Sequence, residues 1–167
     1  ANGYLLDQFI RDGSNQRSDE YGGPAENRIR IVKEVIEAIS AAIGARKVGI
    51  RLSPNISYNG MSDSDPIATY TTLMDALNAY DLAYVHVRET LPKDGEKLDL
   101  WVTSTIRGVY RGNLLVNGGY DKKSATAALE NNEADAVVFG VPFIANPDLV
   151  ERFRIDTPLN PPDQKTL

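Results

Sequence analysis

The chain has 167 residues and a mass of 18.3 kDa, and it is 42% hydrophobic and 25% charged, a composition typical of one globular domain with a single core. Its formal net charge of −5 argues against a nucleic-acid surface and against a polybasic membrane anchor. With no cysteine and one histidine, the sequence excludes disulfides, thiolate metal sites and a multi-histidine metal centre. We therefore expect one domain over residues 1–167, a small-molecule partner and no metal site.

No apolar run is long enough to span a membrane, and the N-terminus lacks the basic and apolar regions of a signal peptide, so we expect a cytoplasmic protein. Residues 1–23 predict a long loop. Its acidic residues in the run SDEY, together with Glu26, indicate a salt-bridged scaffold rather than a metal site.

A helix is predicted next, opened by Pro24 and ended by Gly44. Its apolar residues recur at spacings of three and four and form one stripe, made of Ile29, Val32, Val35, Ile36, Ile39 and Ile43. Further helices are expected over residues 67–80, 99–112 and 122–134. A last helix is expected to have Asn146 as its cap and Pro147 at its first position.

Between these helices lie four short apolar runs, at residues 47–54, 82–89, 113–120 and 135–141. They are rich in valine and leucine on both faces, which is typical of buried parallel strands. Strands that alternate with helices form either a doubly wound sheet or part of a (β/α)8 TIM barrel. The number of units favours about the C-terminal half of a barrel, from the end of strand 4 through helix 8.

Functional residues of parallel α/β folds gather where the strands end, which directs attention to the glycines of VNGGY and VFGV. Gly118, Gly119 and Gly140 could present backbone N–H groups to a phosphate, although a tight turn is the more common explanation of a glycine pair by itself. Arg51 has apolar neighbours on its strand, so we expect it to be buried and to need an anionic ligand or an internal ion pair. His86 lacks an acidic partner nearby in the sequence, which favours a hydrogen-bonded core residue over a catalytic one.

Several segments together resemble the old yellow enzyme family of FMN-dependent NAD(P)H:flavin oxidoreductases, or ene-reductases. The most specific is ANGYLLDQFIRDGSNQRSDEYGGPAENRIR at residues 1–30. It is followed in order by VGIRLSP, LAYVHVRE, VNGGY and VFGVPFIANPDLVERF. The resemblance implies a flavin-binding (β/α)8 barrel that takes hydride from NAD(P)H and reduces the C=C bond of enones and related activated alkenes.

The resemblance also implies residue roles. Asn2 would bind the substrate carbonyl oxygen, and Tyr4 would be the acid that protonates the α-carbon. Arg51 would face the pyrimidine edge of FMN, whereas Gly118, Gly119, Gly140 and Val141 would lie around its phosphate.

Two departures from the family pattern are visible. The family has a second carbonyl-binding residue, usually histidine, three positions before Asn2, and it has arginine where this chain has Val141. A lost charge-assisted contact to the phosphate would cost on the order of a few kcal/mol of FMN affinity. The alternatives are therefore a flavin-independent relative, or a half-barrel assembly module without a complete FMN site. Such a module is inactive alone and associates with its own copy or with the complementary half.

Overall fold

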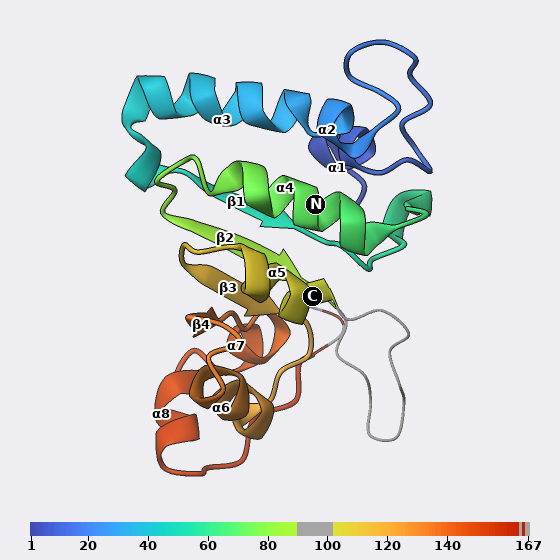
Figure 1. Cartoon of the computed structure of the whole chain (residues 1–167). Coiled ribbons are helices and arrows are strands. Elements are labelled where there is room, and N and C mark those ends of the chain that lie inside the picture. The colour runs from blue at the N-terminus through green and yellow to red at the C-terminus, as the bar shows by residue number, and fades with distance from the viewer. Residues whose placement is uncertain (90–101, 164, 166–167) are drawn as a thin grey trace.

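The computed structural model describes residues 1–89, 102–163 and 165, and its centre is a parallel sheet of four strands. The strands are β1 (Gly49–Leu52), β2 (Tyr84–Arg88), β3 (Leu114–Asn117) and β4 (Ala136–Val137). They pair in the order β1-β2-β3-β4, so each strand lies beside the next one in the sequence (Figure 1). A doubly wound sheet reverses its strand order at a switch point, whereas a barrel does not. The observed order is that of a barrel segment.

Helices connect the strands and cover one face of the sheet. The helix expected between Pro24 and Gly44 is present as α2 (Ala25–Arg28) and α3 (Arg30–Ile43), which meet at Ile29. The crossovers that follow contain α4 (Pro66–Leu77), α5 (Val102–Val109) and α6 (Lys122–Glu130). The expected segment 99–112 is only partly described, because residues 99–101 lie outside the described ranges.

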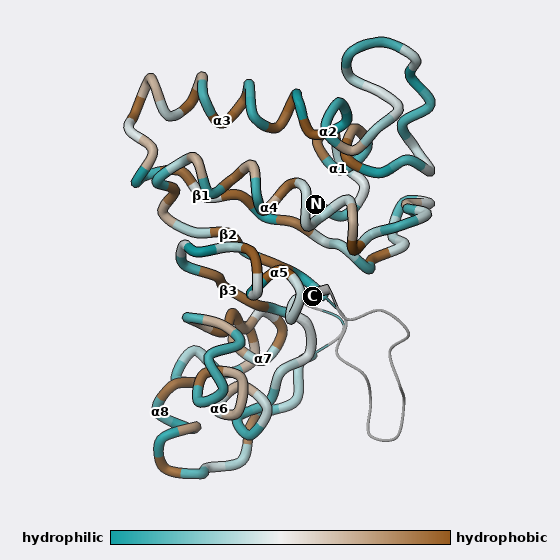
Figure 2. The backbone as a smooth tube through the Cα atoms, in the orientation of Figure 1, coloured by the Kyte–Doolittle hydropathy of each residue, from teal (hydrophilic) through white to brown (hydrophobic). Residues whose placement is uncertain are grey.

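The core lies between the helices and the sheet (Figures 1 and 2). Its strand residues are those at alternate positions, and its largest helical residues come from α4, with Ile106 from α5. The fully buried members include Tyr70, Leu73, Met74, Leu77, Val85, Val87, Ile106 and Leu114. Only part of the predicted apolar stripe is buried. Ile29, Val32 and Ile36 are buried, whereas Ile39 and Ile43 are 42% and 50% exposed.

The other face of the sheet, called the inner face below, differs from the prediction that both faces are apolar. It carries Arg51, Tyr84, His86, Arg88, Leu115 and Asn117, none of which is fully buried. Gly49 pairs with Tyr84 on this face, and a Cβ added at Gly49 would lie 2.5 Å from the tyrosine ring. The ring of Tyr84 thus fills the place of a side chain at Gly49.

The secondary structure near the N-terminus and near the C-terminus also differs from the prediction. The expected N-terminal loop contains α1 (Leu5–Ile10), and 3-10 turns occur at Ala45–Lys47 and Tyr58–Gly60. The expected strand 135–141 stops at Val137, and Val141 begins α7 (Val141–Ala145), because Pro142 suits the first turn of a helix.

The prediction that Asn146 caps the last helix is wrong. Asp148 occupies the N-cap of α8 (Leu149–Arg154), and Asn146 instead ends α7. The buried Asn146 amide is engaged elsewhere: its Nδ2 donates to Pro142 O (2.9 Å), and its Oδ1 accepts from Asn160 N (2.7 Å). Among the described helices, none is long and apolar enough to cross a membrane.

Candidate active site at the carboxyl ends of the strands

The N-terminal segment lies where β1 ends. The backbone N–H of Asn2 donates to Ser53 Oγ (2.7 Å), and Asn59 Nδ2 donates to the carbonyl oxygen of Asn2 (2.9 Å). Asn2 and Gly3 both have positive φ values, of 58° and 77°, and this tight turn brings Tyr4 to the N-cap of α1. Tyr4 is 68% exposed, so its phenol is accessible. The Asn2 Oδ1 atom is buried without a hydrogen-bond partner among the described residues.

A buried ionic network holds this turn in place. Asp7, on α1, accepts hydrogen bonds from Gly3 N (2.9 Å), Ser53 Oγ (3.2 Å) and Tyr70 OH (3.1 Å). It also pairs with Arg11 (Nε to Oδ1, 3.2 Å), whose Nη2 donates to the carbonyl oxygen of Ser53. Burial is the main reason that the pKa of Tyr70 is raised, so its hydroxyl remains a donor. One carboxylate therefore ties the turn to both α4 and the end of β1.

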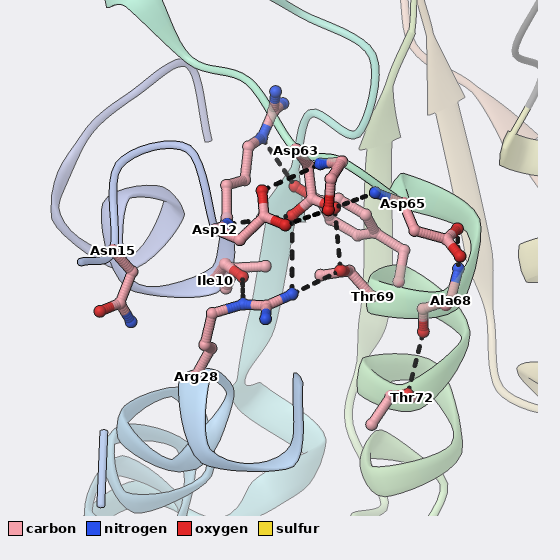
Figure 3. A network of polar contacts seen from close by, with 12 residues as sticks. Ile10, Asp12, Asn15, Arg28, Asp63, Asp65, Ala68, Thr69 and Thr72 are labelled. Carbon is pink, nitrogen blue, oxygen red and sulfur yellow. Dashed lines mark hydrogen bonds and ion pairs between the residues drawn. The ribbon is translucent and has the colours of Figure 1, made fainter. Parts of the chain in front are cut away.

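A second network anchors the loop after α1 (Figure 3). Arg28 is buried and donates to Ile10 O (2.8 Å) and Thr69 Oγ1 (2.7 Å), and it lies 3.8 Å from Asp63 Oδ2. Asp63 also accepts from Asp12 N (3.2 Å). These contacts join α1, α2 and α4, so the N-terminal segment is fixed at several points.

The acidic run SDEY does take part in a loop scaffold, as predicted, but at the surface. Asp19 accepts from Arg17 Nε (3.0 Å), and the Tyr21 hydroxyl donates to Glu34 (3.1 Å). Within the described ranges, no group of three or more His, Asp or Glu side chains is placed to hold a metal ion.

Arg51 and His86 are neighbours on the inner face, paired across β1 and β2. The expectation that Arg51 is buried is wrong, because it lies on the open inner face, where its Nη2 donates weakly to Asn117 Oδ1 (3.5 Å). Burial lowers the pKa of His86 to about 4, with a further contribution from the Arg51 charge, so the imidazole is neutral at pH 7. Its Nε2 has no partner in the described part of the chain, contrary to the interpretation as a hydrogen-bonded core residue.

A pocket of about 240 Å³ lies at the ends of β3 and β4. It is lined by four of the five residues expected to bind the cofactor, Gly118, Gly119, Gly140 and Val141, together with Arg88, Asn117, Tyr120, Val138, Phe139 and Pro142. Arg51 does not line the pocket, but Asn117 connects the two: it accepts from Arg51 and donates through Nδ2 to Val138 O (2.7 Å).

The two adjacent glycines of this pocket have different environments. A Cβ on Gly118 would lie 1.3 Å from the carbonyl oxygen of Glu89, so this position requires glycine for packing. Nothing lies within 4 Å of a Cβ on Gly119 or Gly140, so their backbones face open space. Glu89 itself is buried, and its Oε2 accepts from Thr103 N (2.7 Å) and from the Thr103 hydroxyl. The end of β2 is thereby fixed against α5.

Comparison with known proteins agrees with this geometry. Residues 1–160 match the model of the NADH:flavin oxidoreductase / NADH oxidase family. The chain belongs to this family, which includes the old yellow enzymes.

Among its relatives is the "Probable flavin mononucleotide-dependent alkene reductase" of Leishmania infantum, 44% identical over 99% of this chain and 45% of that protein. Another is 12-oxophytodienoate reductase 7 of Oryza sativa subsp. japonica, 40% identical over 99% of this chain and 46% of that protein.

The old yellow enzyme homologue of Zymomonas mobilis is similar in structure, with a TM-score of 0.93 and 42% identity over 99% of this chain and 47% of that one. The chain thus spans about half the length of the relatives that it matches. This likeness confirms the predicted fold class, a segment of the (β/α)8 barrel of old yellow enzymes.

The sequence did not reveal which residues hold the candidate site of this chain in place. Asp7 and Arg11 stand four residues apart on α1, the spacing at which opposite charges meet on a helix, and this was the available signal. The contact of Asp7 with Tyr70 spans 63 positions and has no local signature. Arg88 ends β2 and lines the glycine pocket; it lies in the segment LAYVHVRE, but the sequence assigned it no role.

Proposed function

We propose that the protein containing this chain is an FMN-dependent ene-reductase, which takes hydride from NAD(P)H and reduces the C=C bond of α,β-unsaturated carbonyl compounds. Membership of the NADH:flavin oxidoreductase family supports the flavin and the nicotinamide donor. The relative named 12-oxophytodienoate reductase supports an enone as the substrate class. The observation that carries the proposal is that the Asn2–Tyr4 turn, Arg51 and the glycine pocket lie at one end of one sheet.

The residues present fit FMN. The pocket offers the open backbones of Gly119 and Gly140, and the neighbouring inner face offers the guanidinium of Arg51. Gly119, Gly140 and Val141 would lie around the phosphate, with Gly118 shaping the turn, and Arg51 would face the pyrimidine edge. When bound, FMN carries hydride from the nicotinamide to the alkene.

The chain's own residues bind and protonate the substrate. Asn2 has an amide held by its backbone contacts to Ser53 and Asn59, and its Nδ2 would donate to the carbonyl oxygen of the enone. Negative charge grows on that oxygen during reduction, so a fixed donor stabilises the transition state. Tyr4 then supplies the proton at the α-carbon, because a phenol stays protonated at neutral pH and this one is exposed beside Asn2.

The decisive experiment restores the remaining strands of the barrel. Residues 1–167 replace the matching segment of the Zymomonas mobilis homologue, and the purified chimera is examined for a flavin absorption spectrum and for NAD(P)H-dependent reduction of 2-cyclohexen-1-one. A yellow, active chimera is expected, together with weak FMN binding by the 167-residue chain alone. A folded chimera that stays colourless with added FMN would favour the non-catalytic assembly module instead.

Tyr4 is tested in the same chimera by Tyr4→Phe. Flavin reduction by NAD(P)H should be unchanged, whereas the oxidation of reduced flavin by enone should slow by about a hundredfold or more, the usual contribution of a general acid. Tyr58→Phe is a matched control, because Tyr58 is similarly exposed and lies next to Asn59. Equal slowing of both half-reactions by Tyr4→Phe contradicts the assigned role.

A further inference from the structure

The glycine pocket at the ends of β3 and β4 has a single charged lining side chain among its ten described lining residues, and that side chain is Arg88. The others are glycines, apolar residues, Asn117 and Tyr120. Within the described ranges this lining combines a guanidinium with open glycine backbones, both of which can bind an anion. This capacity to bind an anion is local, because the chain as a whole has a net charge of −5.

The position of Arg88 in the sheet directs it to this pocket. It is the last residue of β2, and its register partner on β3 is Asn117, directly before Gly118 and Gly119. The buried Glu89 follows Arg88 and is fixed to Thr103. The backbone that carries Arg88 is therefore held in place at the end of β2, beside the pocket.

A second cation lies on the same face. Although Arg51 lies on the open inner face, its partial desolvation lowers its pKa, and the nearby charge of Arg88 lowers the pKa further, which means that the two guanidinium groups repel each other. Asn117 accepts from Arg51 and is the register partner of Arg88, so both arginines lie near Asn117. A phosphomonoester in the pocket would relieve this repulsion.

Val141 also lines this pocket, at the first position of α7, and is 48% exposed. At this position the family pattern has an arginine, and valine can offer the phosphate no charge. We infer that Arg88 supplies the cation that binds the phosphate of FMN in this protein, from the end of β2 instead of from the start of α7. This inference rests on the proposed function, and it names the residue that replaces the missing contact.

The test is equilibrium dialysis of the chimera described above, which carries residues 1–167, against FMN, riboflavin and inorganic phosphate, with circular dichroism to verify folding. Riboflavin lacks the phosphate, so the ratio of the two flavin affinities reports the phosphate contact alone. The ratio should favour FMN by about tenfold or more in the unsubstituted chimera, the range of a charge-assisted hydrogen bond. Inorganic phosphate should compete with FMN and not with riboflavin.

Arg88→Ala should reduce the ratio to near one and leave riboflavin binding unchanged. Arg88→Lys should retain part of the preference, and the double variant Arg88→Ala with Val141→Arg should restore it. Arg111→Ala is the matched control, since it removes the same charge beside a different pocket, one formed by residues 78–82 and 110–112.

The remaining outcomes contradict either the inference about Arg88 alone or the proposed function together with it. If Arg88→Ala leaves the ratio unchanged while FMN still binds, or if the unsubstituted chimera binds FMN no better than riboflavin, the inference is wrong and the proposed function stands. If the folded chimera binds neither flavin, the proposed function fails and the inference fails with it.

Discussion

Gly118→Ala should destabilise the fold far more than the same change at the next residue. The added Cβ would lie 1.3 Å from Glu89 O and 2.6 Å from Glu89 C, and both are backbone atoms that no side-chain rotation can move away. Ordinary contacts between such atoms exceed 3 Å, so β2 and the turn after β3 must separate by about 2 Å. Gly118 also has a φ of 147°, a conformation that costs about 1–3 kcal/mol for an alanine.

The separation would disturb two further contacts. The hydrogen bond from Glu89 N to Asn117 O (2.9 Å) is worth about 1 kcal/mol, and that from Thr103 N to the buried Glu89 carboxylate (2.7 Å) about 1.5–3 kcal/mol. The total loss is therefore about 3.5–7 kcal/mol, a large part of the 5–15 kcal/mol typical of a whole domain.

Urea unfolding of the chain measures this loss directly. Gly119→Ala is the matched control, because its φ of 94° carries a conformational cost of about 1–2 kcal/mol but nothing lies within 4 Å of the new Cβ. If the two variants differ by less than about 1 kcal/mol in the free energy of unfolding, the packing argument for Gly118 is refuted.

Two further predictions concern buried charge. The pKa of His86 is about 4 in the folded chain and about 6.5 when unfolded, so the unfolded chain holds an extra proton between these values. Stability should therefore fall as the pH drops from 6.5 to 4, by about 1–2 kcal/mol after allowance for partial exposure, and urea titrations of His86→Gln should lack this part of the slope; equal slopes would contradict the assignment. Asp7→Asn should cost about 3–5 kcal/mol in the same assay, because it leaves the buried Arg11 without its charge partner. Asp19→Asn, at the exposed pair with Arg17, should have little effect, and similar losses at the two sites would show that the Asp7 network does not anchor the turn.

The order of the elements could be predicted because it depends on local signals. The stripe on α3 and its stop at Gly44 identify the helix, and the four apolar runs identify the strands. The runs of valine and leucine did not reveal which face of the sheet is open, because burial on the inner face depends on the other strands that surround it. Arg51 was therefore placed correctly on β1 and its burial wrongly predicted.

The failures at the C-terminal end have a non-local cause. Asn146 followed by proline is a good local signal for a helix start, but its amide is bonded to Asn160, fourteen positions later. Similarly, the N-terminal motif leads to the prediction of Asn2 and Tyr4 as site residues, whereas Asp7 and Tyr70, whose contacts hold their turn, carry no such motif. A contact between residues 63 positions apart depends on the tertiary fold, so no local pattern predicts it.

Gly49 and Tyr84 constrain how the sequence of the inner face can change. The tyrosine ring occupies the volume that a side chain at Gly49 would need, so the pair fills one layer of the inner face with one aromatic group. A side chain at position 49 requires either that the partly exposed ring of Tyr84 shift or that position 84 become smaller. Exchanging large and small residues between the two strands conserves the total volume of this layer. Among homologous barrels, the two positions should therefore covary in size.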